Sequence, residues 1–474
     1  MSDPLERRGE LREALELAAR AATDYVEALP GEPVMRPGAE ESLAGWEPEL
    51  PEEGNGALEA LGELIERAQA SASRSSGPRF FHFVMGGGTP AALGADWLAS
   101  ALDQVAFAWA SSPLASRLEG IATRWLRDLF ELAPEHTGVL VTGATMANFT
   151  GLVAARSWWG ERLGSDPDEA GLAELPAPRI LTSGYVHPSA VQAVGMLGMG
   201  RASVRRLTRD EVGRLDLGAL ERELATGEPA IVIANAGEVN AGDFDPLAEV
   251  AALTGEHDAW LHVDGAFGLF ARLAPESRHL TEGIEHADSI AADAHKWLNV
   301  PYDCGFAFVR SPERLARALN VGAAYLPAPD DPRPNPGFLT PENSRRARAL
   351  AVWATLRAYG RAGHRAMVER HLRLARRLAE RVDAEPALER LADVNLNIVC
   401  FRARPEGVPE EELDRLNGEL GSALLRDGRV FAGTTTYDGK VALRPAIVNW
   451  QTAEADVDAL IDVLLELLGD RVSP

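Results

Sequence analysis

The sequence predicts an α/β fold with a mostly parallel, seven-stranded sheet, followed by a small C-terminal α+β domain. From about residue 138 onwards, short apolar segments alternate with helical stretches. These segments are apolar along nearly their whole length, which is typical of parallel strands covered by helices on both faces. Beyond about residue 384 the pattern changes to a shorter mixture of strands and helices, which indicates a separate small domain.

The seven predicted strands are 138–141, 179–182, 202–207, 230–234, 260–263, 289–292 and 305–309. Ligands of such sheets bind outside the carboxyl ends of the strands. The loops that follow these segments are therefore the places to look for a functional site.

The N-terminal region predicts an amphipathic helix over 3–29, with Asp3 as its cap and Pro4 at its first position. Its apolar stripe, from Leu11 to Leu29, has helical spacing and must be buried against the protein body or a second subunit. Residues 30–56 are rich in Pro, Gly and Glu and predict an extended connector. A second helix is predicted over 57–72.

The C-terminal part begins with a Pro-rich loop, 327–341, and a long helix, 344–383. A loop of this length is usually functional or disordered. Lys440 falls in a predicted hairpin turn. The small domain is predicted to contain strands at 396–402, 429–433 and 440–447, and helices at 409–426 and 453–468. The predicted division is an N-terminal helical segment (1–75), a large domain (76–360) and a small C-terminal domain (361–474).

Composition excludes several classes of function. The net charge of −24 disfavours nucleic acid and anionic membranes as partners. Two cysteines exclude a disulfide framework and fit a reducing cytoplasm, and the N-terminus has no signal-peptide pattern. The ten histidines show no HExxH pairing, so no metal site is predicted. We expect a cytoplasmic protein.

Lysine is nearly absent, since only Lys296 and Lys440 are found among 47 basic residues. Arginine replaces lysine at surface sites but cannot form a Schiff base, because the guanidinium stays protonated. A GC-rich genome would explain the scarcity. It would not explain why Lys296 lies directly after a predicted strand, where a catalytic amine is plausible.

The loops after four predicted strands carry groups that one cofactor would use together. Residues 142–148 form a small-residue turn before a helix, which suits a phosphate but also fits an ordinary turn. His187 either stacks on a flat ligand or caps the next helix. Asp264, if buried, needs a cation or a donor. Pyridoxal phosphate (PLP) requires this set, because its aldehyde needs a lysine such as Lys296, its ring nitrogen an acid and its phosphate a cradle.

The chain resembles the PLP-dependent amino acid decarboxylases of the aromatic-amino-acid and glutamate decarboxylase group (group II). The resemblance runs from about residue 78 to the C-terminus. It rests on Arg79-Phe-Phe-His-Phe83, Ser112-Pro113 with Glu119, Thr142–Asn148, His187, Phe244-Asp245, His262-Val-Asp-Gly-Ala266, His295-Lys-Trp297 and Ser344-Arg-Arg346. It implies the aspartate-aminotransferase-like fold (fold type I). It also implies a homodimer with active sites at the interface, in which residues 1–75 clasp the other subunit.

The resemblance also implies roles for individual residues. Lys296 would hold PLP as a Schiff base, Asp264 would pair with the ring nitrogen, and His187 and Ala266 would cover the two ring faces. The catalytic residues would then be Lys296, His187 and Asp264. The cofactor-binding residues would be Gly143, Ala144, Thr145, His187, Asn235, Asp264, Ala266, His295 and Lys296.

The implied reaction is decarboxylation of an L-amino acid to an amine and carbon dioxide. Orientation decides the outcome, because only the bond held perpendicular to the ring is broken. Closure of 327–341 would exclude water.

Three features depart from the family pattern. The 327–341 loop contains no tyrosine, where family members carry one that resembles a proton donor, and its only aromatic residue is Phe338. Asn235-Ala-Gly-Glu238 replaces a threonine-rich stretch. Asp293 stands where many members have asparagine, and we expect its carboxylate to point away from the phosphate. An oxidative route to an aldehyde, a carbon–carbon lyase resembling sphingosine-phosphate lyase, and a non-catalytic cofactor-binding dimer remain as alternatives.

The predicted substrate pocket is apolar. Its candidate residues are Phe83, Met85, Gly86, Phe107, Trp109 and Phe338. The same residues also fit plain core packing. No arginine indicates an acidic substrate, and the sequence leaves the amino acid open.

Overall fold

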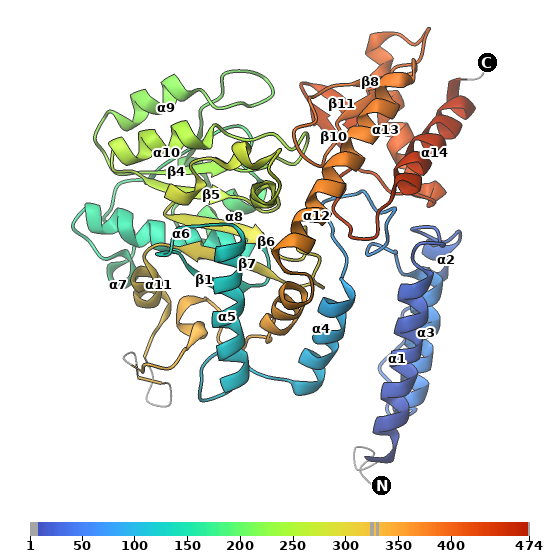
Figure 1. Cartoon of the computed structure of the whole chain (residues 1–474), viewed down its shortest axis with the longest axis horizontal. Helices are drawn as coiled ribbons and strands as arrows, with labels where there is room; N and C mark the ends of the chain where they lie inside the picture. Colours follow the sequence, from blue (N-terminus) through green and yellow to red (C-terminus); the bar gives the residue numbers. More distant parts are fainter. Residues whose placement is uncertain (1–7, 323–326, 329–330, 473–474) are drawn as a thin grey trace.

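The computed structural model describes residues 8–322, 327–328 and 331–472. Figure 1 shows a large domain built around a central sheet, a small C-terminal domain beside it, and a pair of N-terminal helices that lies apart from the sheet. The chain therefore has the α/β architecture with a small α+β domain that the sequence predicts.

All seven predicted strands of the large domain are present in one sheet, in the order β1-β7-β6-β5-β4-β2-β3. Only β7 runs antiparallel to its neighbours β1 and β6. The third segment is shorter than predicted, because 201–203 forms a 3-10 turn before the strand. The strands are β1 (Thr137–Val141), β2 (Arg179–Thr182), β3 (Val204–Arg206), β4 (Ala230–Asn235), β5 (Trp260–Asp264), β6 (Ser289–Asp293) and β7 (Gly305–Val309).

Both faces of the sheet are covered, which explains the continuous apolar strands. In β4, Val232 and Ala234 pack into one core, while Ile231 and Ile233 pack into a second core on the opposite face. The first core includes α5, α9, α10 and α12, and the second includes α6, α8 and α11. The helices of the large domain are α4 (Pro90–Leu102), α5 (Pro113–Leu129), α6 (Ala144–Arg162), α7 (Pro167–Ala170), α8 (Pro188–Met196), α9 (Leu217–Leu224), α10 (Leu247–Glu256) and α11 (Pro312–Leu319).

Helix α12 (Ala349–Ala384) connects the two domains. It begins later than the predicted residue 344, so Arg345 and Arg346 precede it. A kink lies at Gly360, whose φ of 59° suits a residue without a Cβ. Up to Leu372 the helix packs into the core of the large domain, and from Leu374 into the core of the small one.

The small domain has a four-stranded antiparallel sheet, β10-β11-β9-β8, together with both predicted helices. The predicted strand at 429–433 is wrong. Phe431 instead exchanges backbone hydrogen bonds with the incoming segment at Arg79 and Phe81, and the strand begins at Thr434. The elements are β8 (Leu388–Arg390), β9 (Phe401–Ala403), β10 (Thr434–Tyr437), β11 (Lys440–Leu443), α13 (Glu410–Asp427) and α14 (Glu454–Val472).

The other strand predictions in this domain are too long, since β9 and β11 each cover only part of the predicted range. The predicted turn before Lys440 is confirmed. Asp438 and Gly439 both have positive φ, 50° and 72°, as a two-residue hairpin turn requires.

Helices α1 (Leu11–Ala28) and α3 (Ala57–Ser71) pack side by side (Figure 1), and the short α2 (Ala39–Leu43) interrupts the predicted connector. No residue of α1 is buried in the single chain, and Leu11 and Leu15 are 67% and 60% exposed. The predicted cap at Asp3 and Pro4 lies outside the described residues.

None of the described helices is long and apolar enough to cross a membrane. The described part of the chain also contains no group of three or more His, Cys, Asp or Glu residues arranged to hold a metal ion.

Candidate active site

Lys296 lies in the turn after β6, at the carboxyl edge of the sheet. Its Nζ atom is 2.9 Å from Asp293 Oδ2 and 5.8 Å from the centre of the Phe267 ring. Its side chain is 20% exposed, so the amine is accessible from one side only. The backbone of Gly86 lies against the backbone of Lys296, where an added Cβ would be 1.8 Å from the Lys296 oxygen. This contact requires glycine at position 86.

Asp264 ends β5 beside Asn235 of β4, with which it is in register. The carboxylate is buried and accepts two hydrogen bonds, one from Asn148 Nδ2 at 2.9 Å and one from Ala266 N at 3.2 Å. Donors of this kind favour the ionised carboxylate. These two donors hold the Asp264 carboxylate in one orientation at the strand end.

A buried chain of hydrogen bonds extends behind Asp264. Ser289 Oγ accepts from Trp260 Nε1 at 3.0 Å and lies 2.8 Å from His262 Nδ1, while His262 Nε2 lies 2.8 Å from Asn148 Oδ1. Burial lowers the pKa of His262 to about 3, so the ring is neutral. Since Asn148 Oδ1 can only accept, His262 Nε2 carries the proton and Nδ1 accepts from Ser289. The chain thus ends with the Asn148 amide donating to Asp264.

His187 caps α8, since the N–H of Ser189 donates to its Nδ1 at 3.2 Å. Burial lowers the pKa of His187, and the charge of Lys296 acts in the same direction, against the opposite effect of Asp264. The ring is therefore a neutral, flat surface near both residues. Capping does not exclude stacking, because the ring nitrogen, and not the ring face, makes the cap.

The turn between β1 and α6 contains Gly143, Ala144 and Thr145. Helix α6 begins there without a side-chain cap. An added Cβ on Gly143 would be 3.1 Å from His295 Cε1, so the turn lies directly against the turn that carries Lys296.

The expectation that Asp293 points away from this turn is wrong. Its Oδ1 accepts from the Ala144 N–H at 2.6 Å. Strand β6 ends at Asp293 and is separated from β1 by β7 alone. From this position the Asp293 side chain reaches the start of α6, which follows β1.

His295 lies beside the same oxygen of Asp293, with Nε2 3.3 Å from Oδ1, and its Nδ1 accepts from Cys304 N at 3.2 Å. Burial lowers its pKa. The Tyr302 ring stacks on the His295 ring, with centroids 4.1 Å apart.

Asn235 lies behind this group. Its side-chain amide donates to Ser183 Oγ at 3.1 Å and Asp245 Oδ2 at 2.9 Å. Burial raises the pKa of Asp245 to about 6. The Asn235 side chain is therefore committed to its protein neighbours and supports the edge of β4.

Arg444, which follows β11, is a residue that sequence reasoning missed. Its Nη1 donates to the Phe83 oxygen at 3.0 Å, and no described carboxylate lies within ion-pairing distance of it. Its positive charge contributes to the lowered pKa of both His82 and His187. The sequence offered one signal for this residue, which is an arginine directly after a strand of the small domain and directly before Pro445. Only the fold brings it to the edge of the large sheet.

The predicted pocket residues separate into two groups. Phe83 is 57% exposed and adjoins Arg444, and Gly86 adjoins Lys296, whereas Met85 packs with Phe80 and Phe431.

The second group joins the described end of the 327–341 loop to the segment before α5. Phe107 and Phe338 are both buried and pack edge to face, 5.9 Å apart. The Trp109 N–H donates to Asn335 Oδ1 at 3.0 Å. This group holds the end of the loop in place.

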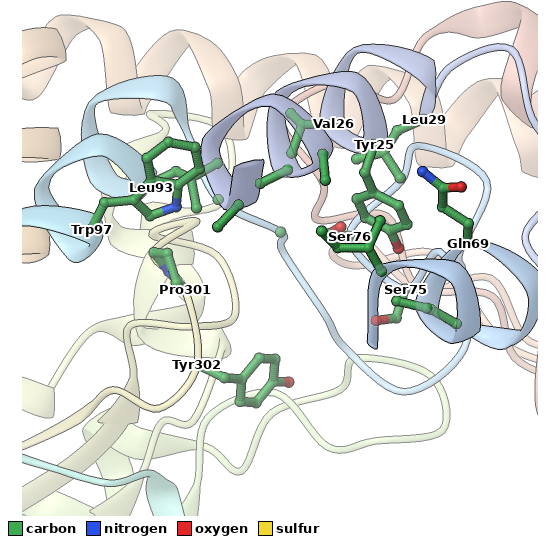
Figure 2. A pocket seen from close by; sticks show the side chains of 18 of the residues that line it. Tyr25, Val26, Leu29, Gln69, Ser75, Ser76, Leu93, Trp97, Pro301 and Tyr302 are labelled. Carbon is green, nitrogen blue, oxygen red and sulfur yellow. The ribbon is translucent and has the colours of Figure 1, made fainter. Parts of the chain in front are cut away.

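An apolar cavity of about 540 Å³ lies between α1, α3 and the large domain. Figure 2 shows Tyr25, Leu93, Trp97 and Pro301 around it, with Tyr302 at one side. Among the described residues its lining contains no Asp, Glu, His, Lys or Arg, and it meets the candidate active site at Tyr302, whose ring stacks on that of His295.

Residues 39–404 match the pyridoxal-dependent decarboxylase conserved domain. The chain belongs to the pyridoxal-dependent decarboxylase family. It is 28% identical to the aromatic-L-amino-acid decarboxylase of Bacillus atrophaeus, over 90% of this chain and 88% of that protein. It is 27% identical to the phenylacetaldehyde synthase of Arabidopsis thaliana, over 96% and 95%. The crystal structure of Oryza sativa TDC with PLP and tryptamine superposes with a TM-score of 0.90 at 26% identity and covers 100% of both chains.

As a member of the pyridoxal-dependent decarboxylase family, the protein is a PLP-dependent carboxy-lyase of fold type I, as the sequence predicts. The geometry fits the cofactor. The buried carboxylate of Asp264 suits a protonated ring nitrogen, and the neutral ring of His187 suits a flat ligand. The backbone N–H groups at the start of α6 suit a phosphate, although the Ala144 N–H already donates to Asp293.

Proposed function

We propose that the protein decarboxylates an L-amino acid to the corresponding amine and carbon dioxide, with PLP held covalently by Lys296. When bound, PLP supplies an electron-withdrawing ring that accepts the electron pair left by the departing carboxylate. The observation that carries the proposal is the meeting of Lys296, Asp264, His187 and Arg444 at one edge of the sheet.

Asp264 is proposed to keep the ring nitrogen protonated. Its two donors, Asn148 Nδ2 and Ala266 N, hold the carboxylate in one orientation and favour its charged form. His187 and Ala266 would cover the two faces of the ring. Gly143, Ala144 and Thr145 would hold the phosphate with backbone N–H groups, beside His295.

Arg444 is proposed to bind the substrate carboxylate. An arginine presents a planar pair of donors that matches a carboxylate, and Arg444 forms no ion pair with any described carboxylate. A fixed carboxylate would set which bond stands perpendicular to the ring. Arg444→Gln should therefore raise KM for the amino acid and lower kcat, while PLP binding is retained.

An oxidative route to an aldehyde is the second candidate, because 327–341 contains no tyrosine. Incubation of the protein and PLP with single L-amino acids, with carbon dioxide, amine, aldehyde and peroxide measured together, separates the two. Amine equal to carbon dioxide supports the first candidate, and aldehyde with peroxide supports the second.

The two lysines give a matched pair of variants for the same assay. Lys296→Ala should abolish turnover and the visible absorbance of bound PLP together. Lys440→Ala changes an exposed hairpin and should leave both intact. Normal turnover of the Lys296 variant would disprove the assignment.

We also infer a homodimer in which α1 and α3 pack against a second copy. Leu11, Leu15 and Leu64 are each more than half exposed, and the apolar cavity of Figure 2 adjoins these helices. Light scattering should give twice the chain mass, and Leu15→Glu combined with Leu64→Glu should give monomers.

A further inference from the structure

Asp293 is a buried carboxylate at the end of β6. It is 2% exposed and has three close polar neighbours. Its Oδ2 faces Lys296 Nζ at 2.9 Å, and its Oδ1 accepts from Ala144 N at 2.6 Å and lies 3.3 Å from His295 Nε2. The carboxylate therefore touches both the lysine and the first N–H group of α6.

Lys296 is the strongest base among these neighbours, and its amine pairs with the carboxylate. Burial lowers the pKa of His295 and of His187, which faces Asp293 from the start of α8. Burial and the charge of Asp293 raise the pKa of Tyr302 to about 12, and burial raises the pKa of Cys304, so neither side chain adds a charge beside Asp293. Among the described residues, Lys296 and His295 are the two basic side chains within ion-pairing distance of Asp293.

A phosphate at the start of α6 would meet this carboxylate. The helix N-terminus attracts an anion through its free N–H groups. Asp293 already takes the Ala144 N–H, and a second anion beside a buried carboxylate is repelled. An uncharged amide at position 293 would be free of this repulsion and could donate an N–H to the phosphate.

We propose that Asp293 sets the affinity of this site for phosphate, because its carboxylate competes with the phosphate group of the cofactor for the Ala144 N–H and repels it. The proposal rests on the proposed function, which assigns the 143–145 turn to the phosphate. It makes Asp293 a residue that weakens cofactor binding and so favours exchange of the cofactor with solution.

The test compares two ligands that lack the aldehyde and cannot react with Lys296. Pyridoxine 5′-phosphate carries the phosphate, and pyridoxine does not. Dissociation constants are measured by tryptophan fluorescence for the wild type, Asp293→Asn and Asp288→Asn. Asp288 flanks the opposite end of β6, where it accepts from Leu261 N at 2.8 Å, so it controls for the loss of a carboxylate.

Asp293→Asn should bind pyridoxine 5′-phosphate on the order of tenfold or more tightly than the wild type at pH 8. Binding of pyridoxine should be unchanged, and Asp288→Asn should match the wild type with both ligands. A phosphate ester takes up its second proton near pH 6. The gain should therefore be smaller at pH 6, where the ligand carries less charge.

Unchanged or weaker binding of pyridoxine 5′-phosphate by Asp293→Asn would overturn the proposal, as would an equal gain for pyridoxine. Circular dichroism checks that the variant is folded. If the variant is not folded, the pH dependence of the wild type tests the proposal instead. Competition with Asp293 predicts that the wild type binds pyridoxine 5′-phosphate more weakly at pH 8 than at pH 6, where the phosphate carries less charge. PLP-dependent release of carbon dioxide by the wild type is measured separately, so failure of this inference leaves the decarboxylase assignment standing.

Discussion

Replacement of His262 by leucine tests the buried hydrogen-bond chain behind Asp264. The ring is fully buried and connects Ser289 Oγ to Asn148 Oδ1. Leucine leaves the hydroxyl without its acceptor and the amide oxygen without its donor. Each unsatisfied buried group costs about 1–3 kcal/mol, so the free energy of unfolding should fall by roughly 2–6 kcal/mol.

The same variant should respond differently to pH. Burial lowers the pKa of His262 to about 3, against about 6.5 in the unfolded chain. As pH falls below 6.5, only the unfolded wild type takes up this proton, so His262 stabilises the wild type above pH 6.5 and loses that contribution towards pH 3. Leucine does not titrate. The deficit of His262→Leu should therefore shrink by about 1 kcal/mol between pH 6.5 and pH 5.5.

Urea unfolding of the PLP-free proteins, followed by circular dichroism at several pH values, measures both effects. Ser289→Ala is the matched control, because it removes the hydroxyl between Trp260 and His262 and leaves the His262–Asn148 contact in place. A deficit below about 1 kcal/mol at pH 7.5, or one that does not change with pH, would refute the assigned hydrogen bonds and the neutral state of His262.

Three further predictions follow from the structure. Arg345→Met should lower the free energy of unfolding by about 3–5 kcal/mol, because it leaves Glu119, 2.7 Å away and buried, without its partner; removal of both charges should cost less in the same urea titration. Asp264→Asn should keep the visible absorbance of bound PLP but greatly slow the release of carbon dioxide, and an unchanged rate would remove Asp264 from its proposed role. Gly439→Ala, at a φ of +72°, should cost about 1 kcal/mol in thermal unfolding and leave activity unchanged.

The large sheet could be predicted because its strands are buried on both faces. The central strands, such as β4 and β6, are buried along their whole length and are therefore short, mainly apolar segments. The end of such a segment also marks the carboxyl edge of the sheet. For that reason Asp264 and Lys296 could be located from their positions in the sequence alone.

The small domain was harder to predict because its strands depend on distant partners. Residues 429–433 are as apolar as a strand, yet Phe431 pairs with the segment around Phe80 instead of a sheet neighbour. A sequence pattern does not show which segment supplies the hydrogen bonds. Arg444 was missed for the same reason, since its place beside Phe83 depends on how the two domains pack.

Some of the motifs that carry the family resemblance supply reactive groups, and others only hold the structure together. Lys296 and Asp264 place reactive groups at the sheet edge, whereas Ser112 caps α5 and Glu119 with Arg345 forms a buried ion pair. Arg345 also donates to the Ala106 oxygen, just before Phe107, which packs against Phe338 at the end of the 327–341 loop. The buried pair therefore fixes the surface on which the loop ends. A motif that holds no reactive group still acts on the site, because it sets where the loop that would exclude water is anchored.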